Sequence, residues 1–388
     1  MSQSAIYYFD NNATTPIAPE VVDAMLPFLK DHWGNPSSAY SFGRDLAAQL
    51  DVARTKVATL LNAEPREIVF TSCGTESNNS AIQSALATRL GKNHVVTTAV
   101  EHSATMKFCE FLQKRGVSVT FLPVSPEGAL DLRLLENAIR PDTAIVSVMW
   151  ANNETGVLFP IEQIAAICRS KDVLFHTDAV QVPGKIKIDV RALGVDFLSL
   201  SAHKLHAPKG IGLLYVKRRV KYQPYIIGGG QERGRRGGTE NVANIVAFGR
   251  AAELAMTLLE DENSRVRRLR DKLEDGIQNH IPGTALNGTK EPRLPNTSNI
   301  AFAGVEAEGI LMLLDQAGIC VSSGSACTTG SLDPSHVLTA MGYDAARSRS
   351  SIRFSLSTYN TEAEVDYVLN HLPGIIAKLR ANSPVGEG

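Results

Sequence analysis

Apolar residues follow two kinds of spacing along the chain, and each kind predicts a different element. Between residues 44 and 61 they recur every three or four positions, which is typical of an amphipathic helix, and residues 19–30 favour a shorter helix. Short apolar runs are typical of buried strands and occupy residues 67–70, 95–98, 117–122, 144–150, 174–177, 197–200 and 212–216. Because these runs mostly alternate with helical stretches, we predict an α/β fold with a mostly parallel sheet flanked by helices.

The pattern changes after residue 216. A loop rich in glycine and arginine follows at 228–241, then a helix around 242–259 and a charged stretch, 260–270, which we expect to be a solvated helical link. Strands near 297–302 and 352–355, with helices between them, predict a smaller α+β domain. A chain of 388 residues exceeds the usual size of a single core. We therefore expect a large domain at 16–259 and a small domain formed by 1–15 and 260–388.

Composition and charge argue against several classes of protein. Hydrophobic residues make up 44% and charged residues 20%, and the net charge is −1 with both signs mixed along the chain. We expect neither nucleic acid nor a membrane as a partner, because no basic face, signal peptide or membrane-spanning apolar run is visible. Five cysteines without a CxxC pair indicate free thiols in a reducing compartment, so we expect a cytoplasmic protein.

A helix that begins directly after a strand is the first candidate site. Residues 71–77 (TSCGTES) supply free backbone N–H groups, and the hydroxyls of Ser72 and Thr75 lie at the positive end of the helix dipole. These features suit a phosphate group, although, taken alone, they are more typical of an ordinary helix N-cap with a capping acid. The chain has no P-loop lysine, and the glycines at 228–238 do not fit GxGxxG, so a nucleotide site is not expected.

Asp178 and Lys204 both follow predicted strands. A carboxylate at the end of a buried strand is either a helix N-cap or a partner for a cation, such as the pyridinium nitrogen of pyridoxal phosphate. Lys204 lies between two apolar runs, where desolvation would lower its pKa and make it reactive. One strand–helix–strand step separates the two residues, so they meet at the same edge of the sheet. Together with the phosphate cup they predict a pyridoxal-phosphate pocket.

Three further residues could complete such a pocket. His102 follows a strand and could place its imidazole over a flat ring, or it is a surface-loop histidine. Asn153 lies in NNETG, whose amides could bind a ring hydroxyl or a substrate carboxylate, although a plain turn has the same composition. Cys327 lies among small and hydroxyl residues without apolar periodicity, which predicts an accessible thiol, whereas Cys320 fits a core position.

These stretches match one family in order from end to end. The chain resembles the cysteine desulfurases of the class V aminotransferase group, and it is most similar to the nitrogen-fixation (NifS-like) type. The matching stretches are YFDNNATTP, GNPSS, FTSCGTESNN, EHSA, NNETG, HTDAVQ, SAHKLHAPKG, RRGGTEN, SSGSACTTGSLDPS and SSIRFSLS. The sequence HKLHAPKG and the short C-terminus resemble the nitrogen-fixation branch more than the housekeeping iron–sulfur branch. The resemblance implies the fold-type-I architecture of pyridoxal-phosphate-dependent transferases.

The resemblance also implies a role for individual residues. Lys204 matches the lysine that bonds the cofactor, Asp178 the partner of the ring nitrogen, and Arg353 the arginine that clamps the substrate carboxylate. Cys327 matches the nucleophile that forms a persulfide, and His102 joins Lys204 as a catalytic residue. The positions that match the family's cofactor-binding set are Gly74, Thr75, His102, Asn153, Asp178, Gln181, Ser201, His203, Lys204 and, from the neighbouring subunit, Thr239; Asn153 also serves the substrate.

The expected reaction is removal of sulfur from L-cysteine, giving L-alanine and a persulfide on Cys327. The resemblance implies a homodimer that passes this sulfur to an iron–sulfur scaffold protein, with the Cys327 persulfide as a transient iron–sulfur ligand. A selenocysteine lyase or an aminotransferase on the same fold is the alternative within enzymes. A non-catalytic sulfur-carrier scaffold is the alternative outside them, but it would not need Lys204, Asp178 and Cys327 together.

Overall fold

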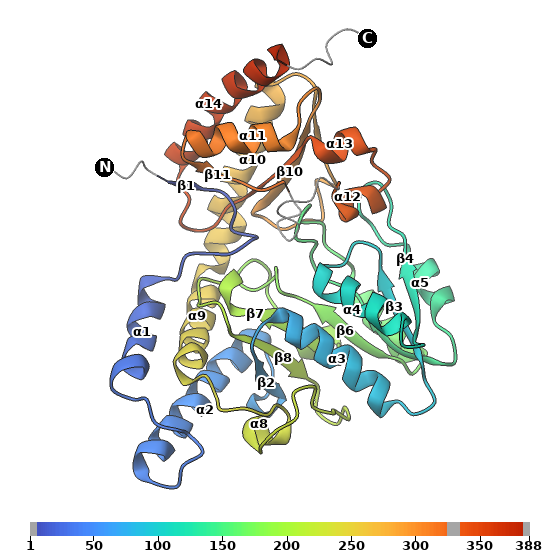
Figure 1. Cartoon of the computed structure of the whole chain (residues 1–388), viewed down its shortest axis with the longest axis vertical. Helices are drawn as coiled ribbons and strands as arrows, with labels where there is room; N and C mark the ends of the chain where they lie inside the picture. The colour runs from blue at the N-terminus through green and yellow to red at the C-terminus, as the bar shows by residue number, and fades with distance from the viewer. Residues whose placement is uncertain (1–5, 324–333, 383–388) are drawn as a thin grey trace.

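A seven-stranded sheet with helices on both faces forms the larger body of the molecule (Figure 1). The structure is a computed structural model that describes residues 6–323 and 334–382. The neighbours in the sheet are parallel except where β8 pairs antiparallel with β2 and β7. The strands, in their order across the sheet, are β2 (Ile68–Thr71), β8 (Gly212–Val216), β7 (Phe197–Ser201), β6 (Leu174–Asp178), β5 (Thr143–Ser147), β3 (His94–Thr98) and β4 (Ser118–Leu122).

Both faces of this sheet are buried, which explains the continuous apolar runs. On β5, Val146 belongs to one core cluster and its neighbour Ile145 to another, because successive side chains of a strand point to opposite faces. The helices of this body are α1 (Pro19–Lys30), α2 (Ser41–Leu61), α3 (Gly74–Thr88), α4 (Ser103–Gln113), α5 (Leu132–Ala138), α6 (Ile161–Ser170), α7 (Val190–Leu193), α8 (Gln231–Gly234) and α9 (Val242–Asp261).

One predicted strand is too long. The apolar run 144–150 predicts a strand up to Trp150, but β5 ends at Ser147. The N–H of Met149 donates to the buried carboxyl of Glu101 at 3.0 Å, whereas the N–H groups of Val148 and Trp150 still donate to β6. This departure brings the chain into the Asn152–Gly156 loop beside the sheet edge, where the predicted site residues lie.

A second, smaller body lies at the other end of the molecule (Figure 1). Its core includes Phe9, Ile300 and Phe354, which come from both ends of the sequence. A three-stranded antiparallel sheet and a two-stranded parallel one lie beside its helices. The elements are β9 (Thr284–Leu286), β10 (Thr297–Phe302), β12 (Ser351–Ser355), β1 (Tyr7–Tyr8), β11 (Ile319–Cys320), α10 (Arg267–His280), α11 (Ala307–Gln316), α13 (Ala345–Arg349) and α14 (Glu362–Ala381). Helix α12 (His336–Ala340) lies between them in sequence, but its buried Val337 and Leu338 belong to the core of the larger body.

The charged stretch 260–270 is the predicted helical link, with Glu260 and Arg268 exposed, but it is not solvated throughout. A π-helical turn, Glu262–Val266, joins α9 to α10, and the side chains of Glu262 and Arg270 are buried. The helix enters the smaller body there, and the Arg270 guanidinium donates to the Leu294 carbonyl oxygen at 3.1 Å. Ionisable side chains are therefore buried at this junction, where composition alone predicts exposure.

The continuous helix Val242–His280 also corrects the expectation that no apolar run could cross a membrane. Within the described part of the chain it is long and apolar enough to do so by length and composition. Its apolar residues, among them Phe248, Ala251 and Ala252, are buried in the core of the larger body. Core helices of globular proteins pass the same test, so this helix is weak evidence for a membrane span.

Candidate active site

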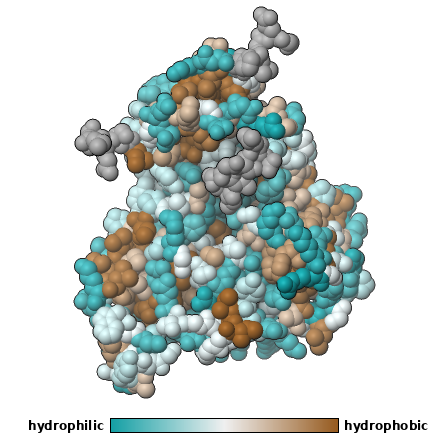
Figure 2. Space-filling model, viewed as in Figure 1, coloured by the Kyte–Doolittle hydropathy of each residue, from teal (hydrophilic) through white to brown (hydrophobic). Residues whose placement is uncertain are grey.

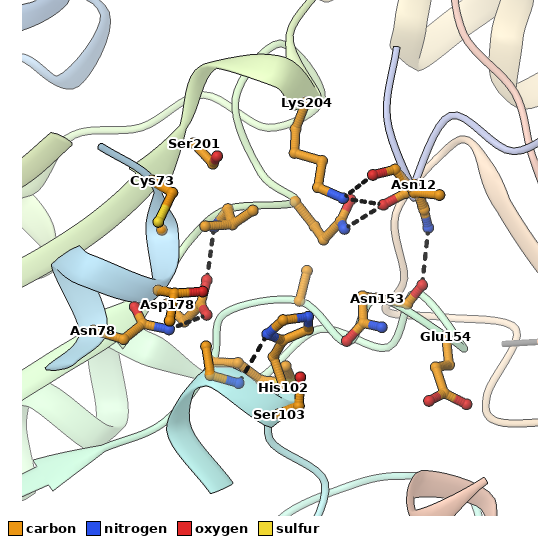
Figure 3. A pocket seen from close by; sticks show the side chains of 18 of the residues that line it. Asn12, Cys73, Asn78, His102, Ser103, Asn153, Glu154, Asp178, Ser201 and Lys204 are labelled. Atoms are coloured by element: carbon orange, nitrogen blue, oxygen red, sulfur yellow. Dashed lines mark hydrogen bonds between the residues drawn. The ribbon is translucent and has the colours of Figure 1, made fainter. Parts of the chain in front are cut away.

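A cavity of ≈ 440 Å³ lies where the carboxyl ends of β6 and β7 face the start of α3 and the smaller body. Figure 3 shows side chains from both bodies pointing into it. Of the predicted site residues that lie in the described ranges, the cavity brings together all but Thr239. Those that line it are Gly74, Thr75, His102, Asn153, Asp178, Gln181, Ser201, His203, Lys204 and Arg353.

The start of α3 forms the predicted anion cup. Helix α3 begins at Gly74, and a Cβ atom there would lie 2.8 Å from a methyl carbon of Val180, so only glycine allows this close approach. The carboxylate of Glu76 turns back to accept the N–H of Ser72 at 2.8 Å, which fixes the loop before the helix. Ser201 lines the cavity on the other side of Gly74. The cup therefore presents backbone donors and a hydroxyl group to the cavity.

Asp178 is a buried carboxylate held by two donors. Its Oδ2 accepts the side-chain amide of Asn78 at 2.6 Å, and its Oδ1 accepts the N–H of Val180 at 3.0 Å. The second contact serves the turn after β6, so the capping alternative is partly correct. The first contact comes from α3 and orients the carboxylate, as Figure 3 shows. Sequence reasoning missed Asn78, although it lies in the matching stretch FTSCGTESNN.

Lys204 is held by the N-terminal segment of the chain. Its Nζ donates to the carbonyl oxygens of Asn12 and, at 2.6 Å, Ala13 (Figure 3). The same Asn12 oxygen accepts the Gln181 side-chain amide at 3.0 Å. Residues 11–13 are therefore a wall of the site that the sequence analysis did not assign. They could have been assigned to the site from the sequence, because they lie in YFDNNATTP, the first stretch that matches the family.

His102 begins α4 and lies half-buried in the cavity rather than on the surface. Its Nδ1 accepts the N–H of Ala104 at 3.1 Å and so carries a lone pair. In the neutral ring the proton must then lie on Nε2. This contact fixes the tautomer and the orientation of the ring, as a residue that stacks on a cofactor or carries a proton requires.

Arg353 approaches the cavity from the smaller body. It lies on β12 and is 1% exposed, and its guanidinium donates to Asp10 Oδ1 at 2.6 Å and to the Asn153 carbonyl oxygen at 2.9 Å. Its Nε has no partner among the described residues. The sequence analysis gave Asp10 no role. Its carboxylate holds the Arg353 guanidinium in place at the cavity wall.

Burial controls the charge of three groups around the cavity. Burial and the nearby positive charge of Lys204 lower the pKa of His203 to about 4, so this ring is neutral near pH 7. Burial raises the pKa of Glu101 to about 8. Burial also raises the pKa of Glu154, whose Oε2 accepts the Ser335 hydroxyl at 2.5 Å. Glu154 and His336 line the cavity as well, and sequence reasoning gave neither a role.

The residues present fit pyridoxal phosphate. Three buried side-chain oxygens of cavity-lining residues have no partner among the described residues: Asn78 Oδ1, Asn153 Oδ1 and Gln181 Oε1. Native proteins rarely leave such atoms unpaired, so their presence here indicates that a ligand completes the site. An anion cup, a carboxylate and a lysine surround these atoms, matching the phosphate, ring nitrogen and aldehyde of the cofactor.

Two predicted residues are not among those that line the cavity in the described ranges. Thr239 is exposed at the end of the loop before α9 and does not line it. Cys327 lies outside the described residues, so its predicted role is untested. Within the described ranges no group of three or more histidine, cysteine or acidic side chains could hold a metal ion.

Comparisons with known proteins agree over nearly the whole chain. The family model "Aminotransferase class-V" matches residues 7–368. The chain is 53% identical to "Cysteine desulfurase 2" of Trichormus variabilis and 51% identical to "Cysteine desulfurase NifS" of Azotobacter vinelandii, covering 98% of this chain and 95% of each relative. A solved "NIFS-LIKE PROTEIN" superposes with a TM-score of 0.91 at 40% identity, covering 97% of this chain and 100% of that one, which confirms the predicted fold. The chain belongs to the class V aminotransferase family, whose enzymes depend on pyridoxal phosphate.

Proposed function

We propose that the protein is a pyridoxal-phosphate-dependent cysteine desulfurase that converts L-cysteine to L-alanine and holds the sulfur as a persulfide on Cys327. The observation that carries the proposal is the meeting of Asp178, Lys204 and Arg353 in one cavity. Curated relatives named cysteine desulfurase match the chain at about half of all positions, which supports this reaction over transamination.

Each cavity residue has a defined task in this reaction. Pyridoxal phosphate supplies, when bound, an aldehyde that captures the substrate amine and a protonated ring that accepts electrons from the α-carbon. Gly74, Thr75, Ser201 and the neutral His203 hold its phosphate. Asp178 keeps the ring nitrogen protonated, because an ionised carboxylate beside it favours the charged form.

Lys204 and Arg353 act on the substrate. The carbonyl oxygens of Asn12 and Ala13 orient the Lys204 amine, which then moves the α-proton of cysteine. Arg353 binds the substrate carboxylate, because a guanidinium fork matches the two oxygens of that group. His102, whose neutral ring carries its proton on Nε2, is the second group that transfers a proton. The Asn153 side chain, whose oxygen has no partner, contacts both cofactor and substrate.

Cys327 carries the sulfur chemistry. Its thiolate attacks the sulfur of the bound cysteine, so an S–S bond forms while the carbon–sulfur bond breaks. The electron pair of the broken bond stays with the substrate carbon, which is then protonated and leaves as alanine. The persulfide is later attacked by an acceptor thiol, and this step restores Cys327.

We also propose a homodimer in which Thr239 completes the phosphate site of the neighbouring subunit. Thr239 is exposed and does not line the cavity of its own chain, which supports this arrangement. Large apolar side chains of the same body, among them Ile227 and Trp33, are 82% and 75% exposed, and Figure 2 shows apolar patches on this body. An isolated subunit would leave this apolar surface in contact with water.

The cellular setting is part of the same proposal. The four cysteines in the described part of the chain are free thiols, as expected for a cytoplasmic protein. We propose that the sulfur passes to an iron–sulfur scaffold protein, with the persulfide of Cys327 as a transient cluster ligand, in a nitrogen-fixation setting. The separate core of the smaller body supports the division into a large domain, 16–259, and a small domain, 1–15 and 260–388.

The test is the product formed by a Cys327→Ala variant. The variant should bind the cofactor and show its absorbance, yet release no alanine from L-cysteine in the presence of a reductant. Cys320→Ala is the control, because this thiol lies on β11 outside the cavity, and it should keep its turnover. Wild-type turnover in Cys327→Ala would refute the persulfide role. A keto acid product, or activity with selenocysteine alone, would identify the aminotransferase or the lyase instead.

A further inference from the structure

The loop that ends at Thr239 is held in a strained conformation by a buried ion pair. Glu232 and Arg233 have φ angles of 47° and 59°, a left-handed region that side chains rarely adopt. The Glu232 carboxylate accepts two hydrogen bonds from Arg54 at 2.7 Å each, and a third from the N–H of Phe70 at 3.0 Å. Strain of this kind persists only where surrounding contacts impose it, so the loop is built to hold one shape.

Close backbone contacts keep that shape up to the residue before Thr239. The N–H of Gly237 donates to the Ile226 carbonyl oxygen at 2.9 Å, which closes the loop. A Cβ atom on Gly237 would lie 2.6 Å from the nitrogen of Gly228, so the two glycine backbones are in direct contact. The N–H of Gly238 donates to the side chain of Gln231 at 3.1 Å. A displacement at one point of this loop must therefore move its end.

Arg236 joins the loop to the phosphate cup of the same chain. Its Nε and Nη2 donate to the two carboxylate oxygens of Glu76 at 3.0 and 3.1 Å. Glu76 is buried in the first turn of α3, and the same carboxylate accepts the N–H of Ser72 in the cup. Burial works to raise the pKa of Glu76, yet the hydrogen bonds from Arg236 and Ser72 hold it below its usual value. The ionised Glu76 carboxylate therefore contacts both the phosphate cup and the loop that ends at Thr239.

We propose that Glu76 and Arg236 are positioning residues that couple the two cofactor sites of the dimer. In each subunit this pair joins two structures: the subunit's own phosphate cup and the loop whose Thr239 contacts the cofactor site of the neighbouring subunit. The inference rests on the proposed function, because it requires the dimer and the contact of Thr239 with the neighbouring site. Coupling of this kind is reciprocal, so cofactor bound in one cup favours the loop position that serves the other.

A simpler role for Arg236 must be separated from this one. Arg236 could act only within its own subunit, by neutralising the charge of Glu76 beside the bound phosphate. That role predicts an effect of Arg236→Met on the cup of the mutated subunit. The coupling role predicts an effect on the cup of the neighbouring subunit, which receives the altered loop.

Mixed dimers distinguish the two roles. Lys204→Ala is placed in one subunit, so that the absorbance of lysine-bound cofactor reports only on the site of the other subunit. Arg236→Met is then added either to the reporting subunit or to the Lys204→Ala subunit, and each apo dimer is titrated with pyridoxal phosphate. Both dimers carry the same substitutions in total, so a general folding defect would affect them alike. Arg236→Lys, which keeps the charge, is measured in the same two arrangements.

We expect about tenfold weaker cofactor binding when Arg236→Met lies in the Lys204→Ala subunit, and a smaller change when it lies in the reporting subunit. Arg233→Met is the control and should leave the affinity unchanged, because Arg233 lies in the same loop but is exposed and forms an ion pair with the exposed Asp51 at 3.7 Å. The reverse order of effects, or no effect in either arrangement, would overturn the coupling.

A last mixed dimer tests separately whether the coupling exists and whether Thr239 contacts the cofactor site of the neighbouring subunit, which the coupling requires. Thr239→Ala in the Lys204→Ala subunit should weaken cofactor binding at the reporting site. If Thr239→Ala weakens binding while Arg236→Met in the same Lys204→Ala subunit does not, the coupling is wrong and the proposed dimer site stands. If Thr239→Ala has no effect there, the proposed contact of Thr239 is wrong, and the coupling is overturned with it.

Discussion

Asn78 donates a 2.6 Å hydrogen bond to Asp178, which joins the helix that forms the phosphate cup to the carboxylate that faces the cofactor ring. The same amide group of Asn78 also contacts the Thr105 hydroxyl on α4 at 3.2 Å. Three elements around the cavity therefore meet at one side chain. Asp178 keeps a fixed direction because one of its oxygens is held from α3 and the other from the turn after β6.

Removing this donor should slow the reaction more than it weakens cofactor binding. Asn78→Ala leaves Asp178 with a single orienting hydrogen bond, and we expect alanine formation to fall by about tenfold, since hydrogen bonds to charged groups contribute ~1.5–3 kcal/mol. The measurement is the rate of alanine formation with saturating cofactor. Gln83→Ala, exposed on the same helix, is the control. An unchanged rate in Asn78→Ala would show that Asp178 does not need this support.

Arg353→Lys tests the substrate clamp. A lysine keeps the positive charge but offers a point charge in place of a fork, so we expect the KM for L-cysteine to rise by about tenfold or more. Asp10→Asn removes the charge that holds the fork while leaving the arginine, and it should raise KM by less. The cofactor absorbance should be unchanged in both variants. A fall in kcat at constant KM would mean that Arg353 does not bind the substrate carboxylate.

The sequence predicted the chemical identity of the site better than its supporting contacts. Asp178, Lys204 and His102 follow strands or open helices, and such local patterns are visible along the chain. Asn12, Asp10 and Glu154 act through contacts with residues far away in sequence, which no local periodicity records. Asn12 and Lys204 are 192 positions apart in the sequence, and only the folded chain brings them together.

Two wrong predictions, the length of β5 and the exposure of the charged stretch 260–270, also arise from contacts between residues far apart in sequence. Strand β5 ends early because Met149 bonds to Glu101, a tertiary contact that overrides the apolar run. Glu262 and Arg270 are charged residues in a charged stretch, and composition alone predicts exposure. They are buried because the long helix enters the smaller body at that point.

Glu101 should make stability depend on pH. Its pKa is raised from 4.5 to about 8 by burial, so the folded protein keeps this carboxyl protonated where the unfolded chain has ionised it. The contribution is present below about pH 4.5 and decreases as the pH rises towards about 8, by up to roughly 5 kcal/mol. Glu101→Gln should lose this dependence, which urea unfolding at a series of pH values measures. A parallel pH profile in both proteins would contradict the assignment.

The smaller body should depend strongly on a buried ion pair between Glu274 and Arg293. The side chains are 3% and 2% exposed, the closest atoms are 2.8 Å apart, and Ser298 donates to the same carboxylate at 2.7 Å. Glu274→Ala leaves the Arg293 charge buried without its partner, and we expect a loss of about 3–5 kcal/mol in the free energy of unfolding. Glu110→Ala, which breaks the exposed pair with Lys107, should change it by less than about 0.5 kcal/mol.

A double variant separates the value of the pair from the cost of an unpaired charge. Replacing both partners by apolar residues of similar size, Glu274→Leu with Arg293→Met, removes the buried charges together. If the loss in Glu274→Ala comes from the stranded guanidinium, the double variant should recover most of the stability, because apolar replacements of buried pairs are often neutral. Urea unfolding of the four proteins gives the comparison. A double variant as unstable as Glu274→Ala would instead assign the loss to the Ser298 contact and the packing around it.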